Sequence, residues 1–430
     1  MEKLLIKNVE LINDGPEYRK QYVGIQNDKI AYIGVAKPSG YETARVIDGT
    51  NKLLVPGMVN AHTHAAMTLF RSYADDMQLI DWLQQMIWPA EEGLTAQDCY
   101  WGTQLAVLEM LKSGTTAFAD MYFFMDETAR CIEETGIRAS IGRCVLSTCP
   151  DGGRSRLQEA VQLYKDWHGK ADGRITVMLE PHAPYTCSKE FLQQVVATAE
   201  KLGSEIHMHL SETEQEVKDC VKQQGLTPIA YADSLGILDA GALIAHAVWA
   251  TPEEITLMAR KKARVAHNPQ SNLKLASGIA PVAAMLKEGV TVALGTDGAS
   301  SNNNLDMLEE CRLAALLQKG LTRDPLAVPA RTALEMATVN GARALGYDNL
   351  GRLEVGCLAD LVLYNMEEPC WHPRNDRMSL LVYAANSRDV DTVIINGRLV
   401  LEQKKPLYID EEKVYAECEA RSKRLTLKKI

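Results

Sequence analysis

The chain has 430 residues, a formal net charge of −10 and ordinary apolar and charged fractions. An acidic balance without a long basic run argues against a nucleic-acid or anionic-membrane partner, and no apolar run approaches the length of a membrane span. The N-terminal stretch lacks the apolar core of a signal peptide, so we expect a cytoplasmic protein with a small-molecule partner. The ten cysteines include no Cys-x-x-Cys pair, which argues against a disulfide framework or a thiolate zinc site.

The two ends of the chain share a β-type pattern. Residues 1–57 give short alternating strands separated by glycine-containing turns, and the pattern returns after residue 350, at 359–364 and 393–400. Strands at both ends of a chain, flanking one central domain, most simply pair with each other. We therefore expect a composite β-sandwich domain built from residues 1–57 and 351–430.

Residues 58–350 alternate short apolar strands with longer helical segments, which is typical of parallel βα units. Eight strands of this kind with intervening helices predict an α/β fold, a (β/α)8 TIM-like barrel that carries the catalytic site. The predicted strands are 58–61, 115–119, 139–145, 175–179, 205–209, 243–245, 264–266 and 290–294.

Histidines gather at the predicted strand ends. Of nine in the chain, seven lie at or just inside such an end, including His62 and His64, which strand periodicity places on one face. Loops are polar in any fold, which accounts for Asp120 and for His267 but not for this concentration of histidine. Because the carboxyl ends of barrel strands meet at one mouth, we expect the histidines to form a site there.

Five ordered motifs carry a resemblance to a known family: PGMVNAHTH at 56–64, HMHLSET at 207–213, AH at 245–246, HNPQSNL at 267–273 and GTDGASSN at 295–302. The chain resembles the amidohydrolase superfamily and, over nearly its full length, the 5'-methylthioadenosine/S-adenosylhomocysteine deaminases within it. The resemblance implies a metal-dependent enzyme that converts both nucleosides to their inosine counterparts and releases ammonia.

The resemblance also implies one divalent metal ion per chain, held by His62, His64, His209 and Asp297. Three imidazoles and a carboxylate suit Zn2+, which we expect, with Fe2+ or Mn2+ as alternatives. His207 shares a strand face with His209 but sits one layer deeper, so we interpret it as a core residue or a residue behind the ligands.

The resemblance implies catalytic roles for three residues. Asp297 takes the proton of the attacking water and passes one to the leaving group, Glu212 protonates the ring nitrogen, and His246 orients the water. Taken alone, Glu212 is better interpreted as a first-turn helix glutamate and His246 as a core histidine. The four ligand candidates in the same order along the chain favour the catalytic interpretation.

The resemblance also implies contacts between the substrate and residues that lie farther from the metal. Glu212 and Asp297 face the adenine, Glu91 accepts hydrogen bonds from the ribose hydroxyls with Glu92 as its rival, and His182 contacts the purine or the sugar.

Two arginines are implied for the carboxylate of S-adenosylhomocysteine. They are Arg143 and Arg156, with Arg154 as an alternative to the latter, since a planar guanidinium suits a carboxylate.

Alternative functions keep the same fold. A deaminase of 5'-deoxyadenosine, adenosine or guanine, or an s-triazine hydrolase, would keep the metal and change the substrate. A non-catalytic scaffold would be expected to have lost ligands, and no ligand candidate is missing. A homo-oligomer is compatible with all of these.

Overall fold

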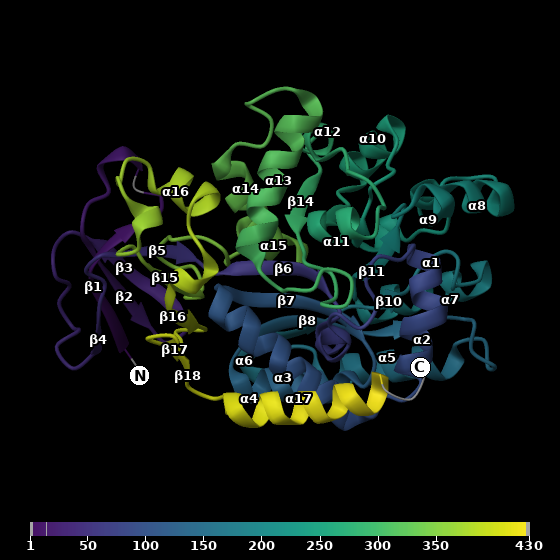
Figure 1. The fold of residues 1–430 in the computed structure, drawn as a ribbon, viewed down its shortest axis with the longest axis horizontal. Coiled ribbons are helices and arrows are strands. Elements are labelled where there is room, and N and C mark those ends of the chain that lie inside the picture. Colours follow the sequence, from purple (N-terminus) through teal and green to yellow (C-terminus); the bar gives the residue numbers. More distant parts are fainter. Residues whose placement is uncertain (1–2, 14, 427–430) are drawn as a thin grey trace.

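The computed structural model describes residues 3–13 and 15–426, and its centre is a barrel of parallel strands surrounded by helices (Figure 1). Each of the eight predicted strands coincides with a strand of this barrel, so the expected TIM-like fold is confirmed. The barrel strands are β6 (Met58–Thr63), β7 (Thr115–Tyr122), β8 (Arg138–Val145), β9 (Ile175–Val177) with β10 (Glu180–Pro181), β11 (Ile206–Leu210), β12 (Ala242–His246), β13 (Arg264–His267) and β14 (Thr291–Leu294).

The barrel consists of two arcs of hydrogen-bonded strands, one from β6 to β10 and one from β11 to β14. At the first junction, the Leu179 nitrogen donates to the Glu205 oxygen at 3.0 Å and the His207 nitrogen donates to the Leu179 oxygen at 3.0 Å. At the second junction, the Asp297 nitrogen donates to the His62 oxygen at 3.0 Å. The first and last strands therefore bring two predicted metal ligands together directly.

Several of the helices between the strands begin at side-chain caps. Before α10, the Thr251 hydroxyl accepts from the Glu254 nitrogen while the Glu254 carboxylate accepts from the Thr251 nitrogen, and Pro252 stands at the first helical position. Among the described residues, no helix combines the length and the hydropathy needed to cross a membrane. The main barrel helices are α3 (Ala96–Ser113), α4 (Met125–Thr135), α5 (Arg154–Trp167), α7 (Lys189–Leu202), α8 (Glu214–Gln224), α9 (Pro228–Ser234), α10 (Pro252–Lys261), α11 (Pro269–Lys274), α12 (Val282–Lys287), α13 (Met307–Thr322), α14 (Ala330–Ala337) and α15 (Val339–Ala344).

A second sheet combines strands from both ends of the chain, as expected, and lies beside the barrel (Figure 1). The strand β1 pairs with β4 through its first half and with β5 through its second half, and β5 pairs antiparallel with β15, where Leu361 faces Pro56. The strands are β1 (Lys3–Leu11), β2 (Gln21–Gln26), β3 (Lys29–Gly34), β4 (Arg45–Asp48), β5 (Lys52–Pro56), β15 (Leu361–Asn365), β16 (Val390–Ile395), β17 (Arg398–Glu402) and β18 (Lys405–Pro406).

The helix that follows the last strand does not stay with this sheet. Helix α17 (Glu411–Thr426) runs along α3, on the outside of the barrel (Figure 1). Part of the segment 351–430 thus packs on the barrel. The division of the chain at residues 57 and 351 stays a prediction, and residues 1–2 and 427–430 of that expected domain lie outside the described part.

A buried ion pair joins the barrel to the sheet. The guanidinium of Arg138, at the start of β8, binds both carboxylate oxygens of Asp360, at 2.8 and 3.1 Å. The two side chains are 1% and 0% exposed, and the Asn396 amide oxygen accepts a further bond from Arg138 at 3.0 Å. Such a pair is stable only while both charges are present.

Candidate active site

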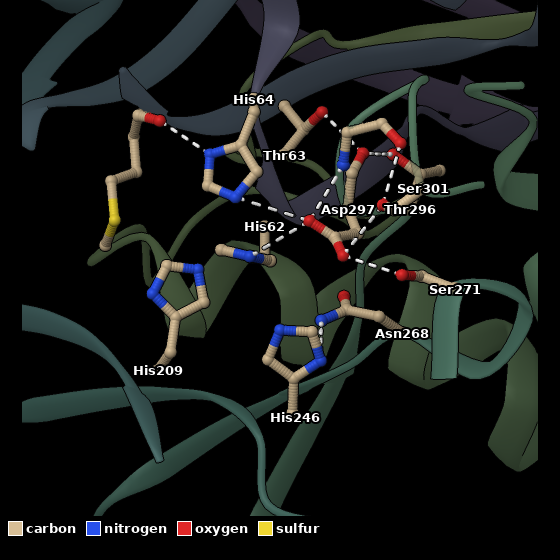
Figure 2. Close-up of polar contacts among 12 residues, drawn as sticks. His62, Thr63, His64, His209, His246, Asn268, Ser271, Thr296, Asp297 and Ser301 are labelled. Atoms are coloured by element: carbon tan, nitrogen blue, oxygen red, sulfur yellow. Dashed lines mark hydrogen bonds and ion pairs between the residues drawn. The ribbon is translucent and has the colours of Figure 1, made fainter. Parts of the chain in front are cut away.

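Three histidines and one aspartate converge at the carboxyl ends of the strands. His62 lies next to the last residue of β6, His64 follows that strand, His209 lies in β11 and Asp297 follows β14 (Figure 2). The Nε2 atoms of His62 and His64 lie 3.6 and 3.3 Å from Asp297 Oδ1. One ring nitrogen from each of the three histidines lies within 4.8 Å of the others. The structure therefore brings all four predicted metal ligands to one point.

Hydrogen bonds on the far side of the rings orient the histidines. His64 Nδ1 lies 2.6 Å from the Met121 oxygen, and His209 Nδ1 lies 2.7 Å from the His182 oxygen. A carbonyl oxygen only accepts, so each Nδ1 carries the proton and each Nε2 has a free lone pair. Both lone pairs are then available in the cluster.

His62 is oriented by a buried chain of side chains. Its Nδ1 lies 2.9 Å from His207 Nε2, and His207 Nδ1 lies 3.0 Å from Glu180 Oε1. His207 and Glu180 are fully buried. His207 thus lies behind a predicted ligand, as interpreted from the sequence, and the part played by Glu180 was not foreseen.

The cluster fits a divalent cation. His62 Nε2 is buried and has no hydrogen-bond partner among the described residues, although it points toward Asp297. A buried nitrogen lone pair without a partner is costly, and a cation between the rings and the carboxylate would satisfy it. Three imidazole nitrogens and a carboxylate oxygen form a donor set that suits zinc.

The carboxylate of Asp297 is held by its other oxygen. Oδ2 accepts from the hydroxyls of Ser271 and Ser301 at 2.7 and 3.0 Å, while Oδ1 faces His62 and His64 (Figure 2). The backbone of Asp297 has φ +61°, a left-handed conformation that turns the chain at the end of β14. Such conformations in residues other than glycine are concentrated at functional sites.

Glu212 and His246 face each other beside the cluster. His246 Nε2 lies 3.8 Å from Glu212 Oε2, and His246 Nδ1 contacts Asn272 Oδ1 at 2.8 Å. Burial raises the pKa of Glu212, which favours its protonated form. Burial also disfavours the imidazolium of His246, but the nearby carboxylates, Glu212 first and then Asp297, together with the hydrogen bond to Asn272 outweigh this effect and raise the pKa of His246. The pair is thus placed to hold a proton.

Glu216 fixes the backbone that carries Glu212. Its two carboxylate oxygens accept from the nitrogens of Ser211 and Glu212 at 3.0 and 2.7 Å. Ser211 has φ +55°, and this left-handed turn brings Glu212 back over the strand end. Glu216 was not foreseen, because a glutamate in the first turn of a helix gives no signal in the sequence beyond ordinary capping.

Glu91 lines a cavity beside the cluster of histidines and Asp297, which we call the inner cavity. Tyr122 donates its hydroxyl to Glu91 Oε1 at 2.7 Å, and burial raises the pKa of Glu91 to about 7. The cavity wall also includes His64, His182, Glu212, His246 and Asp297. The rival Glu92 is exposed and does not line this cavity. Tyr122 was missed, although it follows the same strand as Asp120.

His182 lies beside the cluster without joining it. Its Nδ1 contacts the Thr186 hydroxyl at 3.0 Å, and its ring centroid lies 4.9 Å from that of His209. Burial lowers the pKa of His182 to about 3, so the ring is neutral. A neutral imidazole at this wall suits contact with an uncharged purine or sugar.

The two preferred arginines line a larger outer cavity of about 860 Å³. The guanidinium carbons of Arg143 and Arg156 lie 5.0 and 5.3 Å from the Phe123 ring, and Arg143 Nε donates to Glu159 at 2.7 Å. Arg156 Nη1 is buried and has no hydrogen-bond partner among the described residues. Arg154 is exposed at the start of α5 and does not line the cavity. The substrate-binding roles of these residues stay predictions.

A (β/α)8 barrel with three histidines and an aspartate at its mouth defines a hydrolase of the amidohydrolase type. Residues 53–400 match the model of the amidohydrolase family, and the chain belongs to this family. The enzyme is a hydrolase that acts on C–N bonds.

Relatives with nearly the same length are known. The chain is 51% identical over 425 residues to a 5-methylthioadenosine/S-adenosylhomocysteine deaminase from Moorella thermoacetica, covering 98% of this chain and 99% of that protein. It is 48% identical over 430 residues to a protein of the same name from Pelotomaculum thermopropionicum, covering 99% of each.

Among solved structures, an adenosine deaminase from Xanthomonas campestris with bound zinc superposes with a TM-score of 0.93 at 36% identity, covering 99% of this chain and 98% of that one. A zinc-bound atrazine chlorohydrolase from Arthrobacter aurescens has a TM-score of 0.90 at 24% identity, covering 97% of this chain and 100% of that one. At that identity the likeness shows the fold alone.

Proposed function

We propose that the protein hydrolytically deaminates 5'-methylthioadenosine and S-adenosylhomocysteine to their inosine counterparts and ammonia. One observation carries this proposal: the inner and outer cavities share Trp88, Glu91 and Phe123 in their walls. The predicted catalytic groups, the ribose carboxylate and the arginines therefore follow one another outward from the metal cluster. This order matches the adenine, the ribose and the charged tail of S-adenosylhomocysteine. The names and near-full-length identity of the relatives support the same conclusion.

We propose that His62, His64, His209 and Asp297 hold one Zn2+ ion, with Fe2+ or Mn2+ as alternatives. The zinc bound in the Xanthomonas campestris enzyme supports this choice. When bound, a cation of this kind acts as a Lewis acid that makes a water molecule nucleophilic near neutral pH.

The protein side chains move the protons. Asp297 Oδ1 faces the cluster and accepts the proton of the attacking water, while the two serine hydroxyls hold Oδ2 in place. Glu212, whose pKa is raised by burial, donates a proton to the ring nitrogen of adenine. His246, fixed through its Nδ1 by Asn272, presents Nε2 to orient the attacking water. Asp297 then passes its proton to the departing amine, and the proton of the hydroxyl left on the purine carbon returns to Glu212 as the carbonyl of the product forms.

The outer groups select the nucleoside. Glu91 accepts hydrogen bonds from the ribose hydroxyls, and His182 contacts the purine or the sugar. Arg143 and Arg156 pair with the carboxylate of S-adenosylhomocysteine, since charged guanidinium groups bind a carboxylate well at a partly buried site. 5'-Methylthioadenosine has no such carboxylate and uses only the apolar part of the outer cavity.

Ammonia release measured over a panel of substrates tests the activity. The panel contains both proposed nucleosides, adenosine, 5'-deoxyadenosine, guanine and an s-triazine, with metal content determined on the same sample. We expect the two proposed nucleosides to give the highest kcat/KM. His209→Ala and Asp297→Ala should lose both turnover and tight metal binding, whereas Glu212→Gln should keep the metal and lose turnover. No ammonia from either nucleoside with the metal-loaded enzyme would overturn the proposal.

A further inference from the structure

The C-terminal helix α17 contacts the segment that carries Glu91. Arg424 donates from Nη1 to the Gly93 oxygen at 3.1 Å and from Nη2 to the Asp98 carboxylate. Gly93 follows the short helix α2 (Trp88–Glu91), and Asp98 lies in the first turn of α3. One guanidinium group thus bridges the end of α2 and the beginning of α3.

Asp98 is the anchor of this bridge. Its side chain is fully buried and caps α3 by accepting from the Thr95 nitrogen and hydroxyl at 2.8 and 2.6 Å. Arg421, one turn before Arg424 on α17, donates to the other oxygen of Asp98 at 2.9 Å. Two guanidinium groups and two capping bonds therefore satisfy a carboxylate that is costly to bury unpaired.

The bridge lies two residues from Glu91. The Gly93 nitrogen donates to the Ala90 oxygen at 3.2 Å and the Leu94 nitrogen donates to the Glu91 oxygen at 3.0 Å. These two bonds tie the turn after α2 to α2 itself. Leu425 of α17 is buried against this turn, where a Cβ added to Gly93 would lie 3.3 Å from its side chain. A helix as short as α2 is not stable by itself and depends on such tertiary contacts.

We propose that Arg424, with Arg421, is a positioning residue for Glu91, and that α17 thereby sets the selectivity of the enzyme for substrates with both ribose hydroxyls. The inference rests on the proposed function, in which Glu91 accepts from those hydroxyls. On the inner side, Tyr122 fixes the Glu91 carboxylate. On the outer side, the arginines fix the backbone from which it projects.

The expected effect is on binding of the ribose. A hydrogen bond between a hydroxyl and a carboxylate weakens steeply with misalignment. The main packing partners of α17 are α3, the segment 65–70 and α2, and not the strands whose ends carry the catalytic groups. Loss of the bridge should therefore raise KM for substrates with a ribose diol by about tenfold, the equivalent of one such bond, and leave kcat nearly unchanged.

The test compares three variants with two substrates. Arg424→Gln removes the ion pair with Asp98. Arg424→Lys keeps a charge for Asp98 but has no second donor group in the right place for the Gly93 oxygen. Lys423→Gln is the control, because it removes an exposed charge on the same helix. The substrates are 5'-methylthioadenosine and its 2',3'-dideoxy analogue. We expect KM for the diol substrate to rise in Arg424→Gln, to rise less in Arg424→Lys and to stay constant in Lys423→Gln, with no change for the dideoxy analogue in any variant.

The outcomes separate this inference from the proposed function. If the wild-type enzyme releases no ammonia from either nucleoside, the function itself fails. If it is active but Arg424→Gln raises KM for the dideoxy analogue as much as for the diol, or lowers kcat instead, the positioning role is wrong. Equal KM values for the diol in Arg424→Gln and Lys423→Gln would also overturn it.

Discussion

The contact between Glu216 and the backbone before it offers a sharp test of how the catalytic acid is held. In Glu216→Gln, one of the two carboxylate oxygens becomes an amide group that donates. That group would then face the nitrogen of either Ser211 or Glu212, which also donates. The side chain keeps nearly the same size, so the substitution changes hydrogen bonding and charge without opening a cavity.

The magnitude follows from the lost bond. Burial raises the pKa of Glu216 to about 7, so above that pH the group is a carboxylate and a hydrogen bond to it contributes roughly 1.5–3 kcal/mol. The backbone nitrogen that loses its acceptor is buried. This energy holds the left-handed turn at Ser211 that brings Glu212 over the strand end. If the turn relaxes, only a fraction of molecules holds Glu212 in place, and kcat should fall by about 10- to 100-fold because about 1.4 kcal/mol corresponds to tenfold.

Steady-state kinetics with 5'-methylthioadenosine would measure this effect. Glu214→Gln is the matched control, because Glu214 lies on the same first turn of α8 but is exposed and forms an ion pair with Lys218, at 2.8 Å. We expect the control to keep wild-type kcat and both variants to keep the bound metal and a similar KM. A kcat for Glu216→Gln within twofold of the control would refute the argument that Glu216 positions Glu212.

Two further predictions concern the carboxylate of Glu91 and the ion pair that joins the barrel to the sheet. Because burial raises the pKa of Glu91 to about 7, its carboxyl group is protonated below that pH and accepts fewer hydrogen bonds. KM for 5'-methylthioadenosine should therefore rise as the pH falls from 8 to 6, and this dependence should disappear in Glu91→Gln; a flat KM profile in the wild type would contradict it. Replacing Arg138 with methionine leaves the buried Asp360 charge without its partner and should lower the free energy of unfolding by about 3–5 kcal/mol in urea titrations. A loss below about 1 kcal/mol would show that Asp360 finds another partner.

Local patterns predicted the barrel and the gathering of histidines at its mouth, because both depend on short segments. The set of four metal ligands came from the family resemblance and stays a prediction. Each barrel strand is an apolar run between turn residues, and His62, His64 and Asp297 stand at strand ends that any parallel barrel brings to one mouth. The preference for Arg156 over Arg154 rested on its place directly before the expected helix. The structure has both arginines inside α5, which begins at Arg154, and Arg156 is the one that lines the outer cavity.

Contacts between distant segments were not predictable in this way. Arg424 and Asp98 are 326 positions apart, and Arg138 and Asp360 are 222 apart. A charged residue that is paired and buried has the same local sequence signal as one that is exposed. Tyr122 was missed for a similar reason, since a tyrosine at a strand end does not reveal which carboxylate its hydroxyl will meet.

The composite sheet has a consequence for synthesis of the chain. Strand β5 presents one edge to β1 and the other to β15, which pairs with it through Leu361 and Pro56. During translation at about 5–20 residues per second, β15 follows β5 by about 300 residues, or roughly 15–60 seconds. Throughout that interval the edge of β5 is an unpaired template for strands of other chains. Nascent chains stopped before β15 should therefore aggregate through the N-terminal strands, even though the residues of the metal cluster have already been synthesised.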